Sequence, residues 1–349
     1  MTGRPPSRYR TADFDYALPE DLIAQNPSAA RGDSRLLVVS RGSPDPCRDA
    51  AFTDFPDLLG PNDLLVINTT KVRHARLLGT RPSGAPAEVL LIHPGPEDTW
   101  VAIGKPGSAM RPGKRINLGD GFAVETVRVL PNGERVVRFI GGSATEAMGR
   151  FGALPLPPYI RRRAESADED RYQTVYAARE GSVAAPTAGL HFTAAVLDRV
   201  TSSGTRIATI DLEVGPGTFK PVETENLEHH VMHPECFELP PETALAIRTA
   251  KSAGGRVWAV GTTVVRTLES AAVDAGAVTP GKAETHLMIT PGYAFRVVDA
   301  LLTNFHLPRS TLLMLVCAFA GYDTAMAAYR HAADERYRFY SYGDAMAVL

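Results

Sequence analysis

The chain has few cysteines and no long apolar run, and both scarcities narrow the class of protein. Its 349 residues include only Cys47, Cys236 and Cys317. An odd number of widely spaced cysteines argues against a disulfide framework and a thiolate zinc site, and it favours a reducing cytoplasm. The longest apolar stretch, 312–320, is about half of a membrane span, and the polar, basic start of the chain is unlike a secretory signal. We therefore expect a cytoplasmic protein with no membrane partner.

Net charge is also small, at −2 for the whole chain, but its distribution is uneven. Residues 73–163 hold 14 Lys or Arg against 7 Asp or Glu, a local net charge of +7. A basic segment in an otherwise acidic chain is the expected footprint of a surface that binds a polyanion. Ordinary clustering on a solvated surface explains the same count, because basic patches are common on soluble proteins.

The sequence divides into an α/β pattern interrupted by a segment rich in short strands. Before residue 75, apolar strands are predicted at 35–39 and 63–68, and the second reads as a strand buried on both faces. Between residues 76 and 153, β-rich stretches alternate with turn signals such as Asn132-Gly133, which favours a small barrel or sandwich. The short strands predicted there are 88–92, 99–103, 115–118, 122–129 and 134–140.

Strand and helix alternate after residue 154, which is typical of an α/β sheet domain. Thr193 and Ser310 are suited to cap helices. The predicted helices are 193–201, 242–253, 263–272, 311–320 and 323–337, and the predicted strands are 205–214, 256–261, 285–289 and 296–302. We predict a three-layer α/β domain from 1–75 and 154–349, with a small β-barrel domain inserted at 76–153, in a chain that is a monomer.

Three turns rich in small residues follow or precede predicted elements and are candidates for ligand contact. Small residues let a ligand approach the backbone, and amides at a helix N-terminus favour anions. Tight packing or ordinary helix capping would account for the same residues. The turns lie at 181–192, 214–219 and 257–266, and their candidate binding residues are Thr187, Gly189, Phe192, Gly215, Gly217, Thr218, Gly261, Thr262, Thr263 and Arg266.

Histidines supply the candidate proton-transfer groups. His191 ends the first of these turns, and His306 lies with Asn304 in a polar interruption between two apolar stretches. Histidine is the side chain most readily used for proton transfer near neutral pH. A third group, His229, His230 and His233, has spacing that could place two histidines on one helical face, but no complete zinc motif surrounds it, and we predict no metal.

Long ordered strings of residues carry a resemblance to a known family. They include Phe14-Asp-Tyr, Asp63-Leu-Leu-Val, Leu154-Pro-Leu-Pro-Pro-Tyr, Ala184-Ala-Pro-Thr-Ala-Gly-Leu-His-Phe192, Thr303-Asn-Phe-His-Leu-Pro308 and Tyr337-Arg-Phe-Tyr-Ser-Tyr-Gly-Asp. Together they resemble the S-adenosylmethionine:tRNA ribosyltransferase-isomerases of queuosine biosynthesis over nearly the whole chain. The chain departs from the family pattern at Glu213, where the family favours His, and the inserted segment matches weakly.

The resemblance implies an enzyme that uses S-adenosylmethionine as a co-substrate and ribosyl donor, with no prosthetic group. The acceptor would be a tRNA that already carries 7-aminomethyl-7-deazaguanine at its wobble position. The sulfonium acidifies the neighbouring 5′ carbon, a base removes a proton there, and rearrangement releases adenine and methionine. The product would be epoxyqueuosine-tRNA.

Physical reasoning then suggests roles for individual residues. His191 or His306 is the candidate base, and either could instead protonate the departing adenine; Asp13, Asp15 and Asp344 are weaker candidates. The turn at Thr262 and Thr263, with Arg266, could hold the methionine carboxylate. Aromatic residues expected to stack on a base are Tyr172, Tyr176 and Phe192. Residues expected to meet tRNA phosphates are Lys105, Lys114, Arg115, Arg161 and Arg162.

Three other functions share some of these features. An S-adenosylmethionine-dependent RNA methyltransferase would use the same co-substrate but would release S-adenosylhomocysteine. A non-catalytic RNA-binding module would need the basic segment alone. A metal-dependent hydrolase would use the histidine cluster and would lose activity with a chelator.

Overall fold

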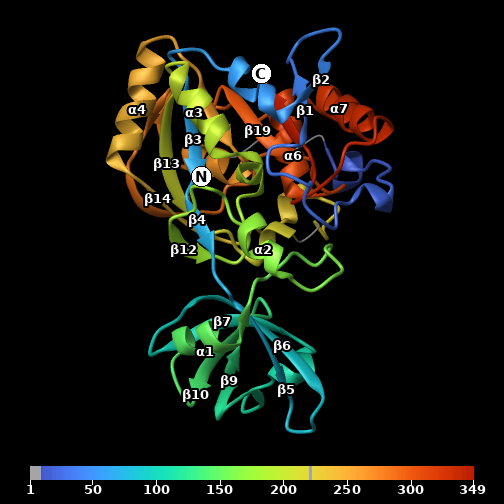
Figure 1. Cartoon of the computed structure of the whole chain (residues 1–349), viewed down its shortest axis with the longest axis vertical. Helices are drawn as coiled ribbons and strands as arrows, with labels where there is room; N and C mark the ends of the chain where they lie inside the picture. The colour runs from blue at the N-terminus through green and yellow to red at the C-terminus, as the bar shows by residue number, and fades with distance from the viewer. Residues whose placement is uncertain (1–8, 220–221) are drawn as a thin grey trace.

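The computed structural model describes residues 9–219 and 222–349, with the side chains of Thr218 and Phe219 outside the described part. Figure 1 shows a larger unit built around one sheet and a smaller, strand-rich unit below it. The larger unit contains both the beginning and the end of the described chain. The smaller unit is formed by one continuous segment between them.

A nine-stranded mixed sheet forms the centre of the larger unit. Its order is β18-β14-β13-β3-β15-β19-β20-β1-β2. The four strands β13, β3, β15 and β19 run parallel, so their carboxyl ends meet at one edge. The strands are β1 (Arg35–Val39), β2 (Cys47–Ala51), β3 (Leu64–Asn68), β13 (Arg206–Leu212), β14 (Glu235–Leu239), β15 (Val257–Val260), β18 (Gly281–Thr285), β19 (Ala300–Asn304) and β20 (Ala345–Val348).

Both faces of this sheet are buried. Alternate residues of β3 belong to different hydrophobic clusters, Leu64 and Val66 on one face and Leu65 and Ile67 on the other, as the two-residue period of a strand requires. The first face packs on α4 (Pro241–Ser252), α5 (Thr262–Ala271), α6 (Thr311–Ala320) and α7 (Tyr322–Asp334). The second face packs on α3 (Ala194–Ser202), η3 (Phe52–Leu58) and η5 (Thr187–His191).

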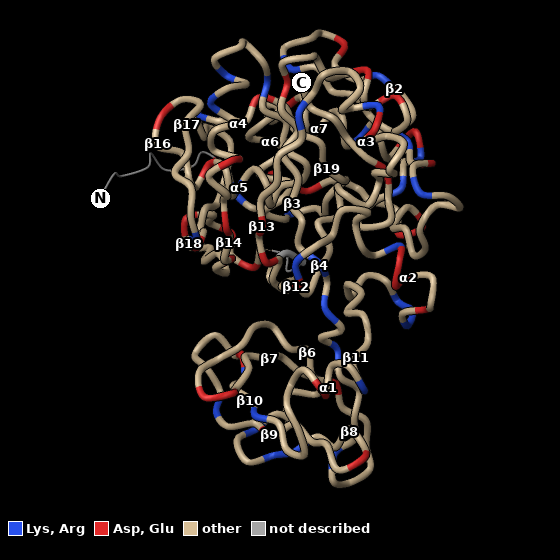
Figure 2. Tube along the Cα trace, turned by 60° about the vertical axis from the view of Figure 1, so that its left-hand side comes forward, with Lys and Arg blue, Asp and Glu red and all other residues tan. Residues whose placement is uncertain are grey.

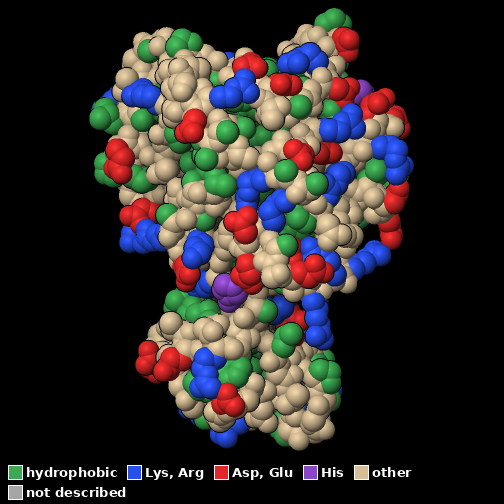
Figure 3. Space-filling view, viewed as in Figure 1, with side chains coloured by type: hydrophobic (Ala, Val, Ile, Leu, Met, Phe, Trp, Pro, Cys, Tyr) green, Lys and Arg blue, Asp and Glu red, His purple; other side chains and the backbone are tan. Residues whose placement is uncertain are grey.

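The smaller unit is a seven-stranded antiparallel sheet in the order β11-β5-β6-β7-β10-β9-β8. A further pairing of Thr80 with Asn117 joins β5 to β8. Its strands are β5 (Arg76–Thr80), β6 (Pro86–Pro94), β7 (Thr99–Lys105), β8 (Arg115–Gly119), β9 (Phe122–Val129), β10 (Arg135–Ile140) and β11 (Gly152–Ala153), with η4 (Gly107–Met110) and α1 (Ala144–Phe151). The space-filling view shows a narrow waist between the two units (Figure 3).

A parallel two-stranded pair connects the units. The chain enters the smaller unit through β4 (Thr70–Val72), and β12 (Arg179–Ser182) pairs with β4 after the chain returns. The remaining elements are η1 (Thr11–Phe14), η2 (Glu20–Leu22), α2 (Ser166–Arg171), η6 (Pro216–Phe219), η7 (Leu227–His229), β16 (Ala272–Asp274) and β17 (Ala277–Val278).

The predicted caps and most predicted elements are present. Thr193 accepts a hydrogen bond from the amide of Val196, and Ser310 accepts one from the amide of Leu313, both at 3.2 Å. The strand predicted at 285–289 is wrong, because β18 ends at Thr285, whose hydroxyl accepts from the amide of Leu287 and turns the chain. The strand predicted at 296–302 begins only at 300.

Four strands of the main sheet were not predicted: β2, β14, β18 and β20. Among the described residues, no single helix is long and apolar enough to cross a membrane. The pair α6 and α7 meets the length and composition requirement only together, with a bend of 116° between them.

Candidate active site

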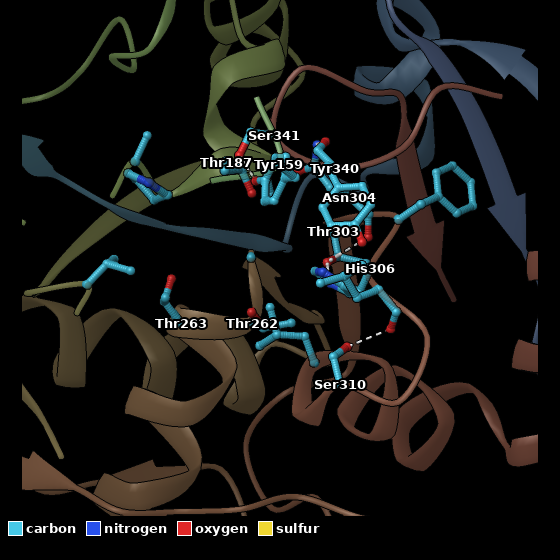
Figure 4. A pocket seen from close by; sticks show the side chains of 18 residues that line it. Tyr159, Thr187, Thr262, Thr263, Thr303, Asn304, His306, Ser310, Tyr340 and Ser341 are labelled. Atoms are coloured by element: carbon cyan, nitrogen blue, oxygen red, sulfur yellow. Dashed lines mark hydrogen bonds between the residues drawn. The ribbon is translucent and has the colours of Figure 1, made fainter. Parts of the chain in front are cut away.

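A pocket lies at the carboxyl edge of the central parallel strands, where ligands bind in open α/β sheets. We call it the sheet-edge pocket (Figure 4). The loops after β13, β15 and β19 reach it from one side, and the segment before β20 closes it from another. Its lining consists of Tyr159, 185–188, Val214, 261–263, 303–307, Ser310, Leu312, Tyr340 and Ser341.

The turn from β15 into α5 supplies one wall. Gly261 has a φ of 90°, a backbone conformation that side-chain-bearing residues rarely adopt, so glycine permits the sharp entry into the helix. Thr262 and Thr263 follow in the first turn of α5 and line the pocket. The first turn of the ten-residue helix, whose amides have no partners within the helix, therefore borders the pocket.

The segment after β19 supplies the opposite wall. The Nε2 atom of His306 lies 2.8 Å from the hydroxyl of Thr303, and its main-chain amide donates to the Tyr329 hydroxyl. Burial lowers the pKa of His306 to about 3. This imidazole is consequently neutral near pH 7, which allows it to accept a proton but opposes a role as proton donor.

His191 does not line the sheet-edge pocket, although η5, which it ends, contributes Thr187 and Ala188 to the lining. Its Nδ1 atom lies 2.7 Å from the hydroxyl of Ser34, and its Nε2 atom lies 3.2 Å from the amide nitrogen of Asn304. Burial lowers the pKa of His191 to about 4. Both ring nitrogens of His191 thus have hydrogen-bond partners, and one of these partners is the pocket residue Asn304.

A second pocket lies between the two units, and we call it the junction pocket. The smaller unit contributes Ile92, His93, Asn132 and Glu134, and the larger unit contributes 215–217, Glu223, Thr224, 229–235, Arg266, Thr311 and Leu312. Leu312 belongs to both pockets, so the two adjoin.

A buried ion pair forms part of the junction pocket. Arg266 and Glu235 are 6% and 5% exposed and pair through Nη1. The Nε atom of Arg266 also donates to the carbonyl oxygen of Leu287 at 3.0 Å. The expectation that Arg266 grips a carboxylate with both arms of its guanidinium is therefore not met, because Glu235 already occupies it.

The predicted Gly-rich turn and the histidine cluster both reach the junction pocket. Gly215 and Gly217 line it beside the histidines. A Cβ at Gly217 would stand 2.9 Å from the ring of His233, so a larger residue at this position would require the ring to move. The interpretation of His229 and His233 as neighbours on a helix is wrong, because η7 ends at His229. Among the described residues, no group of three or more acidic, His or Cys side chains could hold a metal ion.

Comparisons with known proteins give the family. A family model described as "Queuosine biosynthesis protein" matches residues 11–348. The S-adenosylmethionine:tRNA ribosyltransferase-isomerase of Symbiobacterium thermophilum is 52% identical over 97% of this chain and 100% of its own length. That of Natranaerobius thermophilus is 50% identical over 96% and 98%. The chain belongs to this family.

A solved structure agrees with this assignment. The crystal structure of S-adenosylmethionine tRNA ribosyltransferase from Thermotoga maritima matches with a TM-score of 0.54 and 35% identity. The match covers 97% of this chain and 100% of the other. The mixed α/β architecture with large sheets is therefore shared with the family.

The aromatic residues expected to stack on a base lie outside both pockets. Tyr172 and Phe192 have no exposed surface and belong to two hydrophobic clusters. Tyr176 packs edge-on against Phe192. A Cβ added at Gly189 would stand 2.2 Å from the Tyr176 hydroxyl. These residues, and Gly189 with them, pack in or against the hydrophobic clusters beside η5.

The basic residues expected to meet tRNA fall into two groups. Lys105, Lys114, Arg115 and Arg161 are exposed. Arg162 is different, because its two terminal nitrogens bind the carboxylate of Asp168 at 2.5 and 2.8 Å. Burial raises the pKa of Asp168, but Arg162 and the hydrogen bonds around it lower the pKa to about 2. Arg162 therefore stabilises the fold. Lys and Arg are spread over the smaller unit, whereas acidic residues gather at the β14 and β18 edge (Figure 2).

Sequence reasoning missed several residues of the site. Tyr159, Tyr340 and Ser341 line the sheet-edge pocket, and the hydroxyls of Tyr159 and Ser341 lie 2.5 Å apart. Their signal was present, since Tyr159 lies in the proline-rich string and Tyr340 in the C-terminal string of the family resemblance. Asp344 is buried, its carboxylate accepts hydrogen bonds from the amides of Arg35 and Arg338, and it does not line the sheet-edge pocket.

Proposed function

We propose that this protein transfers and isomerises the ribosyl moiety of S-adenosylmethionine onto 7-aminomethyl-7-deazaguanine at the wobble position of tRNA. Epoxyqueuosine-tRNA would form, and adenine and methionine would leave. The observation that carries the proposal is full-length identity of about half to relatives that bear this enzyme name. The two adjoining pockets agree with it, because they offer separate places for a nucleoside and for charged groups.

The adenosine half of the co-substrate is assigned to the sheet-edge pocket. Thr187, Gly261, Thr262, Thr263, Asn304 and His306, all candidates from the sequence, line it together. The methionine half and the incoming deazaguanine are assigned to the junction pocket, where Gly215, Gly217 and Arg266 lie. This arrangement would place the reacting ribose near the boundary at Leu312.

His306 is the better candidate for the base of the two predicted histidines. It lies on the wall of the sheet-edge pocket and is neutral near pH 7, whereas His191 lines a different pocket, with Ser34 and Tyr342. A base must come within hydrogen-bonding reach of the proton that it removes, and position is therefore the first criterion. The low pKa of His306 would make the transfer depend on activation of the 5′ carbon by the sulfonium.

The smaller unit is proposed as an inserted domain, 76–153, with a small barrel formed by closure of the sheet through β5 and β8. The antiparallel order and the Thr80–Asn117 pairing support this reading. Its exposed Lys105, Lys114 and Arg115, with Arg161 of the larger unit, would meet tRNA phosphates. The protein is further proposed to act as a cytoplasmic monomer.

The deciding experiment is incubation with precursor tRNA and S-adenosylmethionine, followed by nucleoside and small-molecule analysis. The expected products are epoxyqueuosine-tRNA, adenine and methionine in equal amounts. S-adenosylhomocysteine and a methylated tRNA would instead identify a methyltransferase. Binding of the tRNA without any turnover would leave an RNA-binding module as the function.

A further inference from the structure

Three polar atoms of the sheet-edge pocket are buried without a hydrogen-bond partner among the described residues. They are Asn304 Oδ1, Thr263 Oγ1 and the Tyr340 hydroxyl. Asn304 is 2% exposed. A buried acceptor that lacks a partner is costly, and such atoms on a pocket wall indicate groups that a ligand satisfies. Asn304 is the most informative of the three, because its amide has one possible orientation.

The main-chain carbonyl of Tyr340 determines which way this amide faces. It lies 2.9 Å from the Asn304 side-chain nitrogen, and a carbonyl oxygen can only accept. The atom that faces it must be the NH2 group, and exchange of nitrogen and oxygen would place two acceptors together. Oδ1 is therefore the atom of Asn304 that is left without a partner among the described residues, on a residue that lines the pocket.

His191 strengthens the same orientation. The NH2 group of Asn304 has two protons, one for Tyr340 and one for the Nε2 atom of His191 at 3.2 Å. Since Nε2 then accepts, the ring proton is on Nδ1, which donates to the hydroxyl of Ser34 at 2.7 Å. A neutral histidine satisfies every one of these hydrogen bonds. His191 thus acts as a positioning residue whose effect reaches the pocket through Asn304.

The pocket lining indicates what kind of donor meets Oδ1. Among the described residues that line the pocket, none is Asp, Glu, Lys or Arg. Burial of an ammonium group in such surroundings is unfavourable, whereas a neutral amino group on a heterocycle is accommodated. Charged side chains line the junction pocket instead, among them Arg266 and Glu235.

We propose that Asn304, oriented by His191 and the Tyr340 carbonyl, accepts a hydrogen bond from the exocyclic 6-amino group of the adenine in S-adenosylmethionine. Asn304 is thereby a specificity-determining residue for a 6-aminopurine, and His191 is the residue that positions it. This inference rests on the proposed function, since it identifies which part of the co-substrate occupies the sheet-edge pocket.

The test compares S-adenosylmethionine with its 6-oxopurine analogue, S-inosylmethionine, as ribosyl donors for precursor tRNA. The 6-oxo group would bring a second acceptor against Oδ1. We expect the natural enzyme to favour the 6-amino donor in kcat/KM by about tenfold to a hundredfold. Asn304→Ala and Asn304→Ser should reduce this ratio to within about threefold of unity. The ratio is measured within each variant, so it does not depend on the fraction of protein that is folded.

Variants at His191 separate positioning from catalysis. His191→Ala should lower the donor ratio and raise KM for S-adenosylmethionine about tenfold, with kcat changed by less than about threefold. His191→Gln, which retains an acceptor near the Nε2 position, should restore most of the ratio. Loss of kcat by a hundredfold or more in both variants, with the donor ratio kept, would show His191 to be a catalytic base and overturn the positioning role. Asn62→Ala and His331→Gln are matched controls away from both pockets.

A third donor identifies the source of the recognised amino group. An S-adenosylmethionine analogue that lacks the α-amino group of methionine should remain sensitive to Asn304→Ala. Suppose instead that Asn304→Ala abolished the preference for donors with the α-amino group and kept the preference for the 6-amino over the 6-oxo purine. The assignment of Asn304 to the adenine would then be wrong. Normal turnover by the natural enzyme without discrimination at the 6-position would refute this inference alone. Absence of adenine release from the natural substrates would refute the proposed function itself.

Discussion

The two adjoining pockets differ sharply in charge. The sheet-edge pocket is lined by small, aromatic and neutral polar residues, and its one histidine has a pKa lowered by burial to about 3. The junction pocket contains the Arg266–Glu235 ion pair, further glutamates and three histidines from one loop. A sulfonium nucleoside has the same division, with a neutral heterocycle at one end and a charged amino acid at the other. This difference in charged lining residues, more than any difference in size, is the reason for our proposal that the two halves of the ligand occupy different pockets.

The largest expected effect concerns the ion pair of the junction pocket. Arg266→Ala leaves the carboxylate of Glu235 buried beside an apolar replacement, which should lower the free energy of unfolding by about 3 to 5 kcal/mol. Replacing both partners, as in Arg266→Met with Glu235→Leu, should lower the free energy of unfolding by clearly less than the sum of the two single changes. Urea denaturation of the two single variants and the double variant measures this coupling. If Arg266→Ala were as stable as the natural protein, the junction pocket would not be a buried charged site.

The next effect concerns the neutral histidines around the sheet-edge pocket. In the folded protein the pKa values of His191 and His306 are about 4 and 3, against about 6.5 when unfolded. At pH values between the folded and the unfolded pKa, the unfolded chain binds more protons than the folded protein. The free energy of unfolding therefore falls as pH decreases below about 6.5. Each histidine should contribute about 1.4 kcal/mol per pH unit in that range.

The measurement is the unfolding free energy at several pH values between about 6 and 4.5. The slope of unfolding free energy against pH reports the number of protons taken up on unfolding, and His306→Gln should reduce this number by close to one relative to the natural protein. At pH 7.5, where neither state protonates these rings, the slopes of the two proteins should agree. If the slope of unfolding free energy against pH were the same in His306→Gln, His306 would be charged in the folded protein over this pH range. The sheet-edge pocket would then hold a charge, as the junction pocket does.

The smallest expected effect concerns a hydroxyl on the sheet-edge wall. Thr263 and Thr267 both lie in α5 and are 8% and 0% exposed, and neither hydroxyl has a partner among the described residues. Only Thr263 lines the pocket. Thr263→Val should weaken S-adenosylmethionine binding about two- to twelvefold, the value of one hydrogen bond. Thr267→Val is the matched control and should bind normally. Calorimetric titration compares them, and equal affinities would remove Thr263 from the site.

Local chemistry made parts of the fold and the site predictable. The glycine between β15 and α5 and the hydroxyls of Thr193 and Ser310 have effects within a few residues, so sequence alone was enough to locate them. The string around Asn304 and His306 was recognisable as polar residues in an apolar setting. The short strand β20 was not, because Ala345–Val348 becomes a strand only between β19 and β1, which come from distant parts of the chain.

The partners of the candidate residues could not be predicted either. Arg266 was expected to hold a substrate carboxylate, but Glu235 lies against it in the folded chain. Arg162 was expected on an RNA surface, but Asp168 and the turn before α2 bind it. Each residue type suited its predicted role, and each role was decided by a neighbour that tertiary packing provides.

The sequence by itself determined the family, the alternation of strands and helices, and the small-residue turns at strand ends, because these depend on residue order and on interactions within a few positions. Only the tertiary structure decided that His191 stands behind Asn304 while His306 faces the pocket. Such choices depend on contacts between residues more than a hundred positions apart. Local preference carries no information about which distant polar group will satisfy a buried ring, because that is determined by the packing of the whole sheet.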